Sequence, residues 1–314
     1  VIDMSTNEVE QVIDLEALGF GSNAKPHDIA VEADGSFWYV SLIAANRVLK
    51  FDRDNELVGS VEFERPGLLA IHPTEDWMFV GRSMAAVNPP QRIGRIERST
   101  MEIEEFDVYV PRPHAIAVSP DGSTVYVGSL AENTLVTFDV ESGESDLLRL
   151  DAPMPHVLVQ FAISPDGSTL VATAEISAKL LVFDITGDAP RLEREIDVGA
   201  RPWHPSWTPD GGEVWFGNLG TNQVTVVDAD SWTVSDVISG NGLAEPHGSS
   251  VSADGRYVYV ANRNTSDTYD AVADFGSEKP AGTLVVIDAA THEIVSVVEI
   301  PAYGAGVGLA GSSW

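Results

Sequence analysis

One pattern recurs along the 314 residues and constrains the fold more than any other feature. Each copy begins with an apolar run, usually opened by proline, and continues through Asp-Gly into a β-rich run. Five copies carry Asp34-Gly35, Asp121-Gly122, Asp166-Gly167, Asp210-Gly211 and Asp254-Gly255. Asp-Gly between alternating apolar runs is the strongest short hairpin signal, because type I′ turns need positive φ at both central residues. Each copy is therefore predicted to form two antiparallel strands joined by a type I′ turn. A degenerate copy starts at Pro66-Gly67.

A second hairpin follows each copy and is marked by an apolar pair and an acid. The six acids are Asp52, Glu97, Asp139, Asp184, Asp228 and Asp288, with spacings of 45, 42, 45, 44 and 60 residues. Residues 1–15 supply a seventh such hairpin, and Pro301 opens a seventh first half. A repeat shared between the two ends of the chain closes a ring of sheets and hides their edges.

We therefore predict one all-β domain over residues 1–314, a seven-bladed β-propeller with four-stranded antiparallel blades. The repeats start near residues 26, 66, 113, 158, 202, 246 and 301, and residues 1–15 complete the last blade. Only 14 residues follow Ile300, so whether the last blade has three or four strands stays open.

The runs at residues 38–41 (WYVS), 125–128 (VYVG) and 257–262 (YVYVAN) resemble the YVTN-repeat, or surface-layer-type, propellers. This resemblance covers nearly the whole chain and implies the same fold. It leaves function open, because such propellers include binding proteins as well as enzymes.

The net charge of the chain restricts the classes of molecule that it could bind. The chain has 48 acidic and 18 basic residues, a net charge of −30, and four lysines. Nucleic acid and anionic membranes would repel such a chain. An acidic, lysine-poor composition resembles proteins of salt-loving organisms. No apolar run is long enough to span a membrane, and no leader is present, so we expect an extracytoplasmic protein whose export signal has been removed. The absence of cysteine excludes thiolate metal sites and covalently attached haem c.

The histidines are placed regularly. Random placement of seven histidines and 18 prolines predicts about 0.4 Pro-His pairs, and the chain has four. His27, His114 and His247 stand seven residues before the Asp of the turn, at the start of the predicted innermost strand. They should therefore converge on the propeller axis from three blades. His156 lies three residues upstream of this position and is expected over the same mouth of the channel.

Three other histidines do not share this position. His204 lies one residue past it, so strand alternation would turn its ring away from the axis, although it stays a candidate ligand or base. His72 and His292 lie in turns and are expected at the surface.

Converging neutral imidazoles without nearby cysteine fit copper or zinc. The layout resembles the all-histidine copper sites on the propellers of nitrous oxide reductases and thiocyanate dehydrogenases. It implies a metal-binding propeller, copper favoured over zinc, that oxidises or reduces a small molecule or anion. Zinc would instead polarise water for hydrolysis. The alternatives are a non-catalytic extracellular binding propeller with structural histidines, and a lactonase-type hydrolase that binds its substrate through Trp203, Trp207 and arginines.

Other polar residues are predicted near the same mouth. Arg82 and Arg263 could hold an anionic substrate by bidentate hydrogen bonds, and Glu175 could ligate metal or act as a base. Asn218 and Asn262 are predicted to bond turn backbone. The long loops at residues 83–91 and 264–282 belong to this face, and the second could act as a lid through Asp267, Tyr269, Asp270 and Asp274 or be a solvated acidic loop. No phosphate-binding loop, nucleophile elbow or His-Glu-x-x-His motif is present, so no nucleotide is expected. The oligomeric state is unknown.

Overall fold

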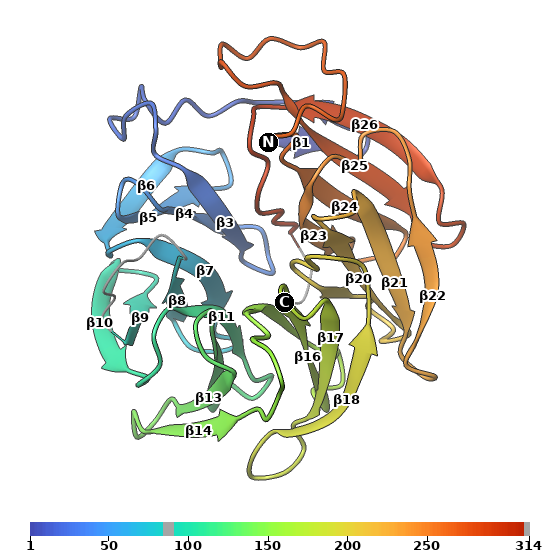
Figure 1. Cartoon of the computed structure of the whole chain (residues 1–314). Helices are drawn as coiled ribbons and strands as arrows, with labels where there is room; N and C mark the ends of the chain where they lie inside the picture. The colour runs from blue at the N-terminus through green and yellow to red at the C-terminus, as the bar shows by residue number, and fades with distance from the viewer. Residues whose placement is uncertain (84–90, 311–314) are drawn as a thin grey trace.

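The computed structural model describes residues 1–83 and 91–310 and shows sheets arranged around a central axis (Figure 1). Six sheets are four-stranded, antiparallel meanders in chain order. The first three blades are β3 (Pro26–Val31), β4 (Phe37–Leu42), β5 (Arg47–Asp52) and β6 (Leu57–Glu62); β7 (Pro66–Ile71), β8 (Trp77–Arg82), β9 (Arg92–Glu97) and β10 (Glu102–Asp107); β11 (Pro113–Val118), β12 (Thr124–Ser129), β13 (Thr134–Asp139) and β14 (Ser145–Arg149).

The next three blades have the same order. They are β15 (Leu158–Ile163), β16 (Thr169–Ala174), β17 (Lys179–Asp184) and β18 (Arg191–Asp197); β19 (Ser206–Trp207), β20 (Glu213–Asn218), β21 (Gln223–Asp228) and β22 (Thr233–Ile238); β23 (Pro246–Val251), β24 (Tyr257–Asn262), β25 (Gly282–Asp288) and β26 (Ile294–Ile300). The first strand of each blade contacts the first strand of the next, from β3 through β7, β11, β15 and β19 to β23. These strands form the inner ring.

The seventh blade combines the two ends of the chain, as predicted, and completes a seven-bladed β-propeller. Its outer part is a short hairpin, β1 (Ile2–Asp3) paired with β2 (Glu8–Val9). Its inner part is the terminal segment, residues 304–309, which runs between β3 and β23. The approach is close: a Cβ atom at Gly306 would lie 2.9 Å from Asp28 Cα, and one at Gly248 would collide with the carbonyl oxygen of Ala305. Within the described residues this blade has only the two strands of the hairpin, so the predicted four-stranded pattern does not extend to it and the strand expected after Pro301 is not formed.

The predicted hairpins are confirmed, but the type I′ turn is wrong. In each Asp-Gly turn only the glycine has positive φ, for example Gly122 at 78°. The loop closes when the N–H of Gly122 donates to the carbonyl of Ser119. The aspartate accepts hydrogen bonds instead: Asp121 Oδ1 receives them from the Ser119 hydroxyl and from the backbone N–H and hydroxyl of Ser123.

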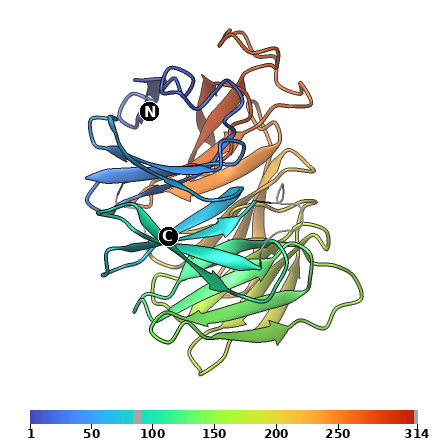
Figure 2. The same cartoon turned by 90° about the vertical axis from the view of Figure 1, so that its left-hand side faces the viewer.

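The hydrophobic core is divided into layers between neighbouring blades. One layer joins Phe79 of the second blade to Phe138 of the third, and another joins Phe161 to Leu135 across the next boundary. Ile2 of the hairpin and Leu309 of the terminal segment pack against Tyr259 of the sixth blade. The side view shows the sheets stacked face to face around the axis (Figure 2). In the part of the chain that the structure describes, no helix could cross a membrane.

Candidate functional site

Three histidines lie at the start of inner strands, each directly after a proline. His27 is the second residue of β3, His114 of β11 and His247 of β23. Each strand pairs with its neighbour through a register shift that begins at that proline. Such a bulge leaves residues out of the ladder and re-aims their side chains. Here the shift coincides with three imidazoles that are almost completely buried.

The rings of these histidines meet, as the sequence predicted. The ring centroid of His27 lies 5.6 Å from that of His114 and 5.7 Å from that of His247. The Nε2 atoms of His27 and His114 are 3.4 Å apart. Imidazoles from the first, third and sixth blades therefore form one cluster at one end of the channel.

His204 belongs to the same cluster, against the expectation that it would turn away. Its ring centroid is 4.7 Å from that of His247 and 6.3 Å from that of His27. The expectation was wrong because strand alternation does not apply there. In this blade β19 is only Ser206–Trp207, and Pro202 forms an isolated bridge to Asn218. The four rings of His27, His114, His204 and His247 are called the histidine cluster below.

His156 makes different contacts. Its Nδ1 lies 2.8 Å from the hydroxyl of Ser177, and its backbone N–H donates to Asn133 Oδ1. Among the described residues its ring contacts no other histidine ring. The structure therefore places His156 beside the fourth blade's own loop and not with the cluster.

Backbone carbonyls orient two of the cluster rings. His114 Nδ1 lies 2.7 Å from the carbonyl of Val159, and His247 Nδ1 lies 3.2 Å from the carbonyl of Ala305. A carbonyl can only accept, so each Nδ1 carries the proton and each Nε2 keeps its lone pair. Within the described residues, the buried Nε2 atoms of His204 and His247 have no hydrogen-bond partner. Unpaired buried nitrogen lone pairs are costly unless a ligand uses them.

Burial keeps these rings neutral. It lowers the pKa of His114 to about 4 and that of His204 to about 3. Burial also lowers the pKa values of His27 and His247 well below the usual range. The positive charge of Arg263 adds to the lowering for His27, His204 and His247. Neutral imidazole is the form that binds metals or accepts a proton.

Trp203 and Arg263 lie beside the cluster. The Trp203 ring packs at 4.1 Å from the ring centroid of His247, and Arg263 Cζ lies 5.2 Å from the Trp203 ring. Burial lowers the pKa of Arg263 to about 10, which still leaves it charged. Among the described residues its guanidinium has no hydrogen bond or ion pair, whereas Arg201 is paired with Glu175 at 2.8 Å. Arg263 is therefore the cation with free donors next to the imidazoles.

Arg82 and Glu175, which were predicted to belong to the site, instead bind other residues of the protein. Arg82 is buried, donates to the carbonyls of Glu64 and Arg92, and pairs with Glu105 at 2.8 Å. Glu175 holds Arg201. Asn262 bonds loop backbone as predicted, because its Oδ1 accepts from the N–H of Ala244. Asn218 does not: its side-chain amide donates to the Thr225 hydroxyl on the neighbouring strand.

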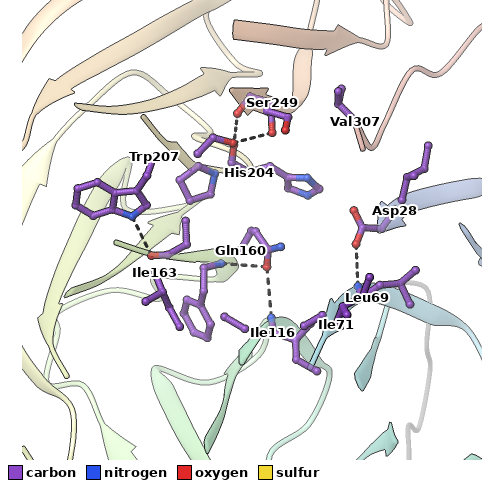
Figure 3. A pocket seen from close by; sticks show the side chains of 18 of the residues that line it. Asp28, Leu69, Ile71, Ile116, Gln160, Ile163, His204, Trp207, Ser249 and Val307 are labelled. Carbon is purple, nitrogen blue, oxygen red and sulfur yellow. Dashed lines mark hydrogen bonds between the residues drawn. The ribbon is translucent and has the colours of Figure 1, made fainter. Parts of the chain in front are cut away.

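The central channel continues beneath the cluster and holds two polar groups that the sequence analysis missed. Figure 3 shows Asp28, Gln160 and His204 around this cavity, together with aliphatic side chains of the inner strands. Asp28 Oδ2 accepts the N–H of Leu69 at 2.8 Å, and burial raises the pKa of Asp28 to about 7. The cavity volume of about 60 Å³ suits a few water molecules. One signal was available, because Asp28, Gln160 and His204 all lie one residue past the position of His27 in their repeats.

One further expectation is corrected. His72 is 4% exposed and not at the surface; its Nε2 lies 3.0 Å from the carbonyl of Gly122 and its Nδ1 accepts the N–H of Glu75. His292 lies in a turn and is partly exposed, in line with the prediction, and it pairs with Asp236.

The acidic loop is not a lid over the cluster. Tyr269 donates to Glu299 on β26, the outermost strand of its blade, and so does the N–H of Val272. Figure 1 shows the connection between β24 and β25 extending outward beyond β26. The other predicted long loop, residues 83–91, lies almost wholly outside the described residues.

No set of three or more His, Cys, Asp or Glu side chains in the described part of the chain already has the arrangement of a metal site. The pair His27 and His114 brings two Nε2 atoms together, and the rings of His204 and His247 are inclined to that of His27 by 67° and 68°.

Comparisons with known proteins agree on the fold. A family model described as "Lactonase, 7-bladed beta-propeller" matches residues 86–203, less than half of the chain. Hydrazine synthase from Kuenenia stuttgartiensis superposes with a TM-score of 0.73 and 19% identity, over 93% of this chain and 91% of that one. A streptogramin B lyase structure gives a TM-score of 0.70 and 14% identity, over 91% and 88%. At these identities the structural likeness shows the fold alone. No curated protein sequence matches.

Proposed function

We propose that the histidine cluster binds one transition-metal ion at the mouth of the channel, with copper favoured and zinc as the alternative. The observation that carries this proposal is the 3.4 Å separation between the Nε2 atoms of His27 and His114. Two nitrogens bound at 2.0–2.1 Å to one tetrahedral ion lie about 3.4 Å apart. The Nε2 atoms of His204 and His247, which have no hydrogen-bond partner within the described residues, would complete the ligand set.

The surroundings of the rings support this proposal. Metal-binding histidines almost always donate their second ring N–H to a carbonyl or carboxylate, which fixes the tautomer. His114 and His247 do so through Val159 and Ala305. Imidazole suits both metals, and for a given nitrogen site Cu²⁺ binds more tightly than Zn²⁺. Copper would supply one-electron chemistry for a small molecule or anion, and Arg263 would hold a negatively charged one.

Metal loading tests the proposal directly. Protein purified without chelator, incubated with Cu²⁺ or Zn²⁺ and desalted should retain close to one ion per chain by elemental analysis. The double variant His27→Ala/His247→Ala should retain less than a tenth as much, while His292→Ala, outside the cluster, should match the wild type. Nitrogen hyperfine splitting in the electron paramagnetic resonance spectrum of the Cu²⁺ form would identify imidazole ligands. Equal retention in the double variant would refute the assignment.

A lactonase-type hydrolase is the second candidate, favoured by the family-model match over residues 86–203. In this case a neutral imidazole of the cluster would act as general base toward water, and Arg263 with Trp203 would orient the substrate. Opening of δ-valerolactone, followed by base uptake at constant pH in the presence of a chelator, separates this candidate from the metal centre. Chelator-resistant turnover that disappears in His247→Ala would favour it, and absence of turnover would exclude it for that lactone.

We also propose that the protein works outside the cytoplasm in a saline environment, as a YVTN-type propeller. The net charge of −30 and the four lysines support this proposal. Fractionation of the source cells with a specific antibody tests it, and detection only in the cytosolic fraction would contradict it.

A further inference from the structure

Six residues occupy equivalent positions around the mouth of the channel and are called the rim positions below. Each directly precedes the first paired residue of an inner strand, and its carbonyl accepts the N–H of the residue that follows the second strand. In blade order the rim positions hold Lys25, Arg65, Arg112, Val157, Arg201 and Glu245. The four histidines of the cluster follow two or three residues later in their blades, so the rim positions lie around the entrance to the cluster.

The backbone conformation does not explain why these residues are basic. All six have φ between 50° and 60°, a region that glycine and asparagine adopt most easily. None of the six is glycine or asparagine, and four are Lys or Arg. The chain has 18 basic residues among 314, so six positions chosen at random would hold about 0.3 of them. A residue type that the backbone disfavours points to a role of the side chain.

Ion pairs with neighbouring acids do not explain these basic residues either. Of the four, only Arg201 has an ion pair within the described residues, with Glu175 at 2.8 Å. Arg65 donates only to a backbone carbonyl, and the side chains of Lys25 and Arg112 form no hydrogen bond or ion pair in the described part of the chain. All four residues are exposed or partly exposed. Three positive charges at the mouth therefore have no acidic partner in direct contact.

The two ends of the propeller differ in charge. At the end opposite the cluster, twelve turns join the first strand to the second and the third to the fourth in six blades, and they hold fifteen acidic and three basic residues. At the mouth, Arg263 adds a fifth basic residue to the four of the rim positions. Outside residues 10–24 and the outward acidic loop, the connections at the mouth hold five acids, Glu64, Glu132, Asp151, Glu175 and Glu245. An anion therefore meets less repulsion at the mouth than at the opposite end.

We propose that the basic residues of the rim positions draw small oxyanions, such as carboxylates, to the mouth, where Arg263 and the histidine cluster bind them. Charges of one sign around a cleft raise the local concentration of ligands of the opposite sign. An oxyanion fits better than a halide, because a guanidinium group matches two oxygens of one ligand. This inference deepens the proposed function by naming the ligand as an anion, and its last step rests on the cluster being the binding site.

Two nitroxide probes of the same size measure the local concentration of anions in the metal-free protein. Carboxy-PROXYL is a carboxylate, and carbamoyl-PROXYL is its neutral amide. At each backbone amide, the ratio of line broadening by the anionic probe to that by the neutral probe cancels exposure and reports the electrostatic potential. At about 0.05 M salt this ratio should be at least two-fold higher at residues 130–132 and 219–221, at the mouth, than at residues 121–123 and 166–168, at the opposite end. The difference should nearly vanish at about 1 M KCl.

A pair of double variants tests which charges are responsible. Lys25→Gln/Arg112→Gln removes two charges from the rim positions and should lower the ratio at the mouth about two-fold. Arg53→Gln/Arg256→Gln removes the same charge from the opposite end and should leave the ratio at the mouth unchanged. Equal ratios at the two ends of the wild type, or the same loss at the mouth in both variants, would overturn the proposal.

Titration of the metal-free protein with acetate and with neutral acetamide tests the last step. Acetate should shift the amide resonances of Trp203, His247 and Arg263 to saturation, and acetamide should not. Lys25→Gln/Arg112→Gln should need about twice as much acetate for half saturation. Equal titration by the two ligands, or equal titration of variant and wild type by acetate, would overturn the proposal. Since neither experiment needs a metal, failure of metal loading and failure of this proposal are separate results.

Discussion

At the scale of single residues, burial gives the histidine cluster a measurable pH signature. In the metal-free protein the pKa of His114 is lowered to about 4, whereas an unfolded histidine has a pKa near 6.5. Between these values the unfolded chain takes up a proton that folded His114 does not, so stability falls as the pH falls from about 6.5 to about 4. His114→Gln should lose less stability over this interval, by roughly 3 kcal/mol. Urea unfolding at a series of pH values with chelator checks this, and parallel curves would contradict it.

Arg263 supports a second prediction at this scale. Its guanidinium lies beside Trp203 and lowers the pKa of three imidazoles; within the described residues it has no direct ion pair, although Glu245 and Glu175 act on it electrostatically. A charge-assisted bidentate hydrogen bond contributes about 1.5–3 kcal/mol. Arg263→Gln should therefore weaken acetate binding to the metal-free protein at least ten-fold, measured by line broadening of ¹³C-labelled acetate. Arg256→Gln, at the opposite end of β24, is the control. The same loss in both variants would show a general charge effect.

At the scale of elements, the Asp-Gly turns depend on the aspartate as an acceptor. Three hydrogen bonds to Asp121 lower its pKa, so the carboxylate stabilises the fold above the unfolded pKa of about 3.9, and this contribution is lost as the pH falls through the lower folded value. Asp121→Ala should lower the free energy of unfolding at pH 7 by about 1 kcal/mol. The difference between variant and wild type should shrink below pH 3.5. A pH-independent difference, measured by thermal unfolding, would argue against this role of the charge.

The hairpins and their spacing were predictable because turn signals and alternation are local properties of the sequence. The spacing of seven residues between His27 and Asp34 predicted that the imidazole lies at the start of the inner strand, and the structure confirmed this. His204 could not be placed in the same way, because the interruption of its strand depends on how residues 202–205 pack. Asp28 and Gln160 were missed because their placement depends on register shifts, which lie between Pro26 and Ile29 in β3 and between Leu158 and Gln160 in β15. The outward course of the acidic loop depends on Glu299, which is 30 residues away from Tyr269.

At the scale of the whole molecule, the cluster exists only because the ring closes. His27 and His114 are 87 residues apart, and His247 bonds Ala305 in the terminal segment. The fold was predictable from the repeats. There are seven copies, and one of them is divided between the two ends of the chain, which requires a closed ring. The terminal segment's contact with His247 was not, because Pro301 predicted a strand there, whereas residues 304–309 form none and meet His247 through the carbonyl of Ala305. Closure of the propeller and orientation of one cluster ring thus depend on the same few residues.

The net charge of −30 should make the stability of the molecule depend on salt concentration, and one pair of facing glutamates allows this to be measured. Glu102 on β10 lies directly opposite Glu97 on β9, and like charges opposite each other destabilise a sheet. Screening at high salt removes much of that repulsion, since the Debye length falls to about 3 Å at 1 M. The melting temperature of the wild type should therefore rise by several degrees between about 0.05 M KCl, where repulsion between surface charges is weakly screened, and about 2 M KCl, where it is strongly screened.

Glu102→Gln should melt higher than the wild type at the low salt concentration and equal to it at the high one. Glu104→Gln is the opposite control, because Glu104 pairs with Arg95 at 2.8 Å, so its loss should not raise the melting temperature at either salt concentration. If both variants gain stability alike at low salt, total charge and not the facing pair sets the dependence.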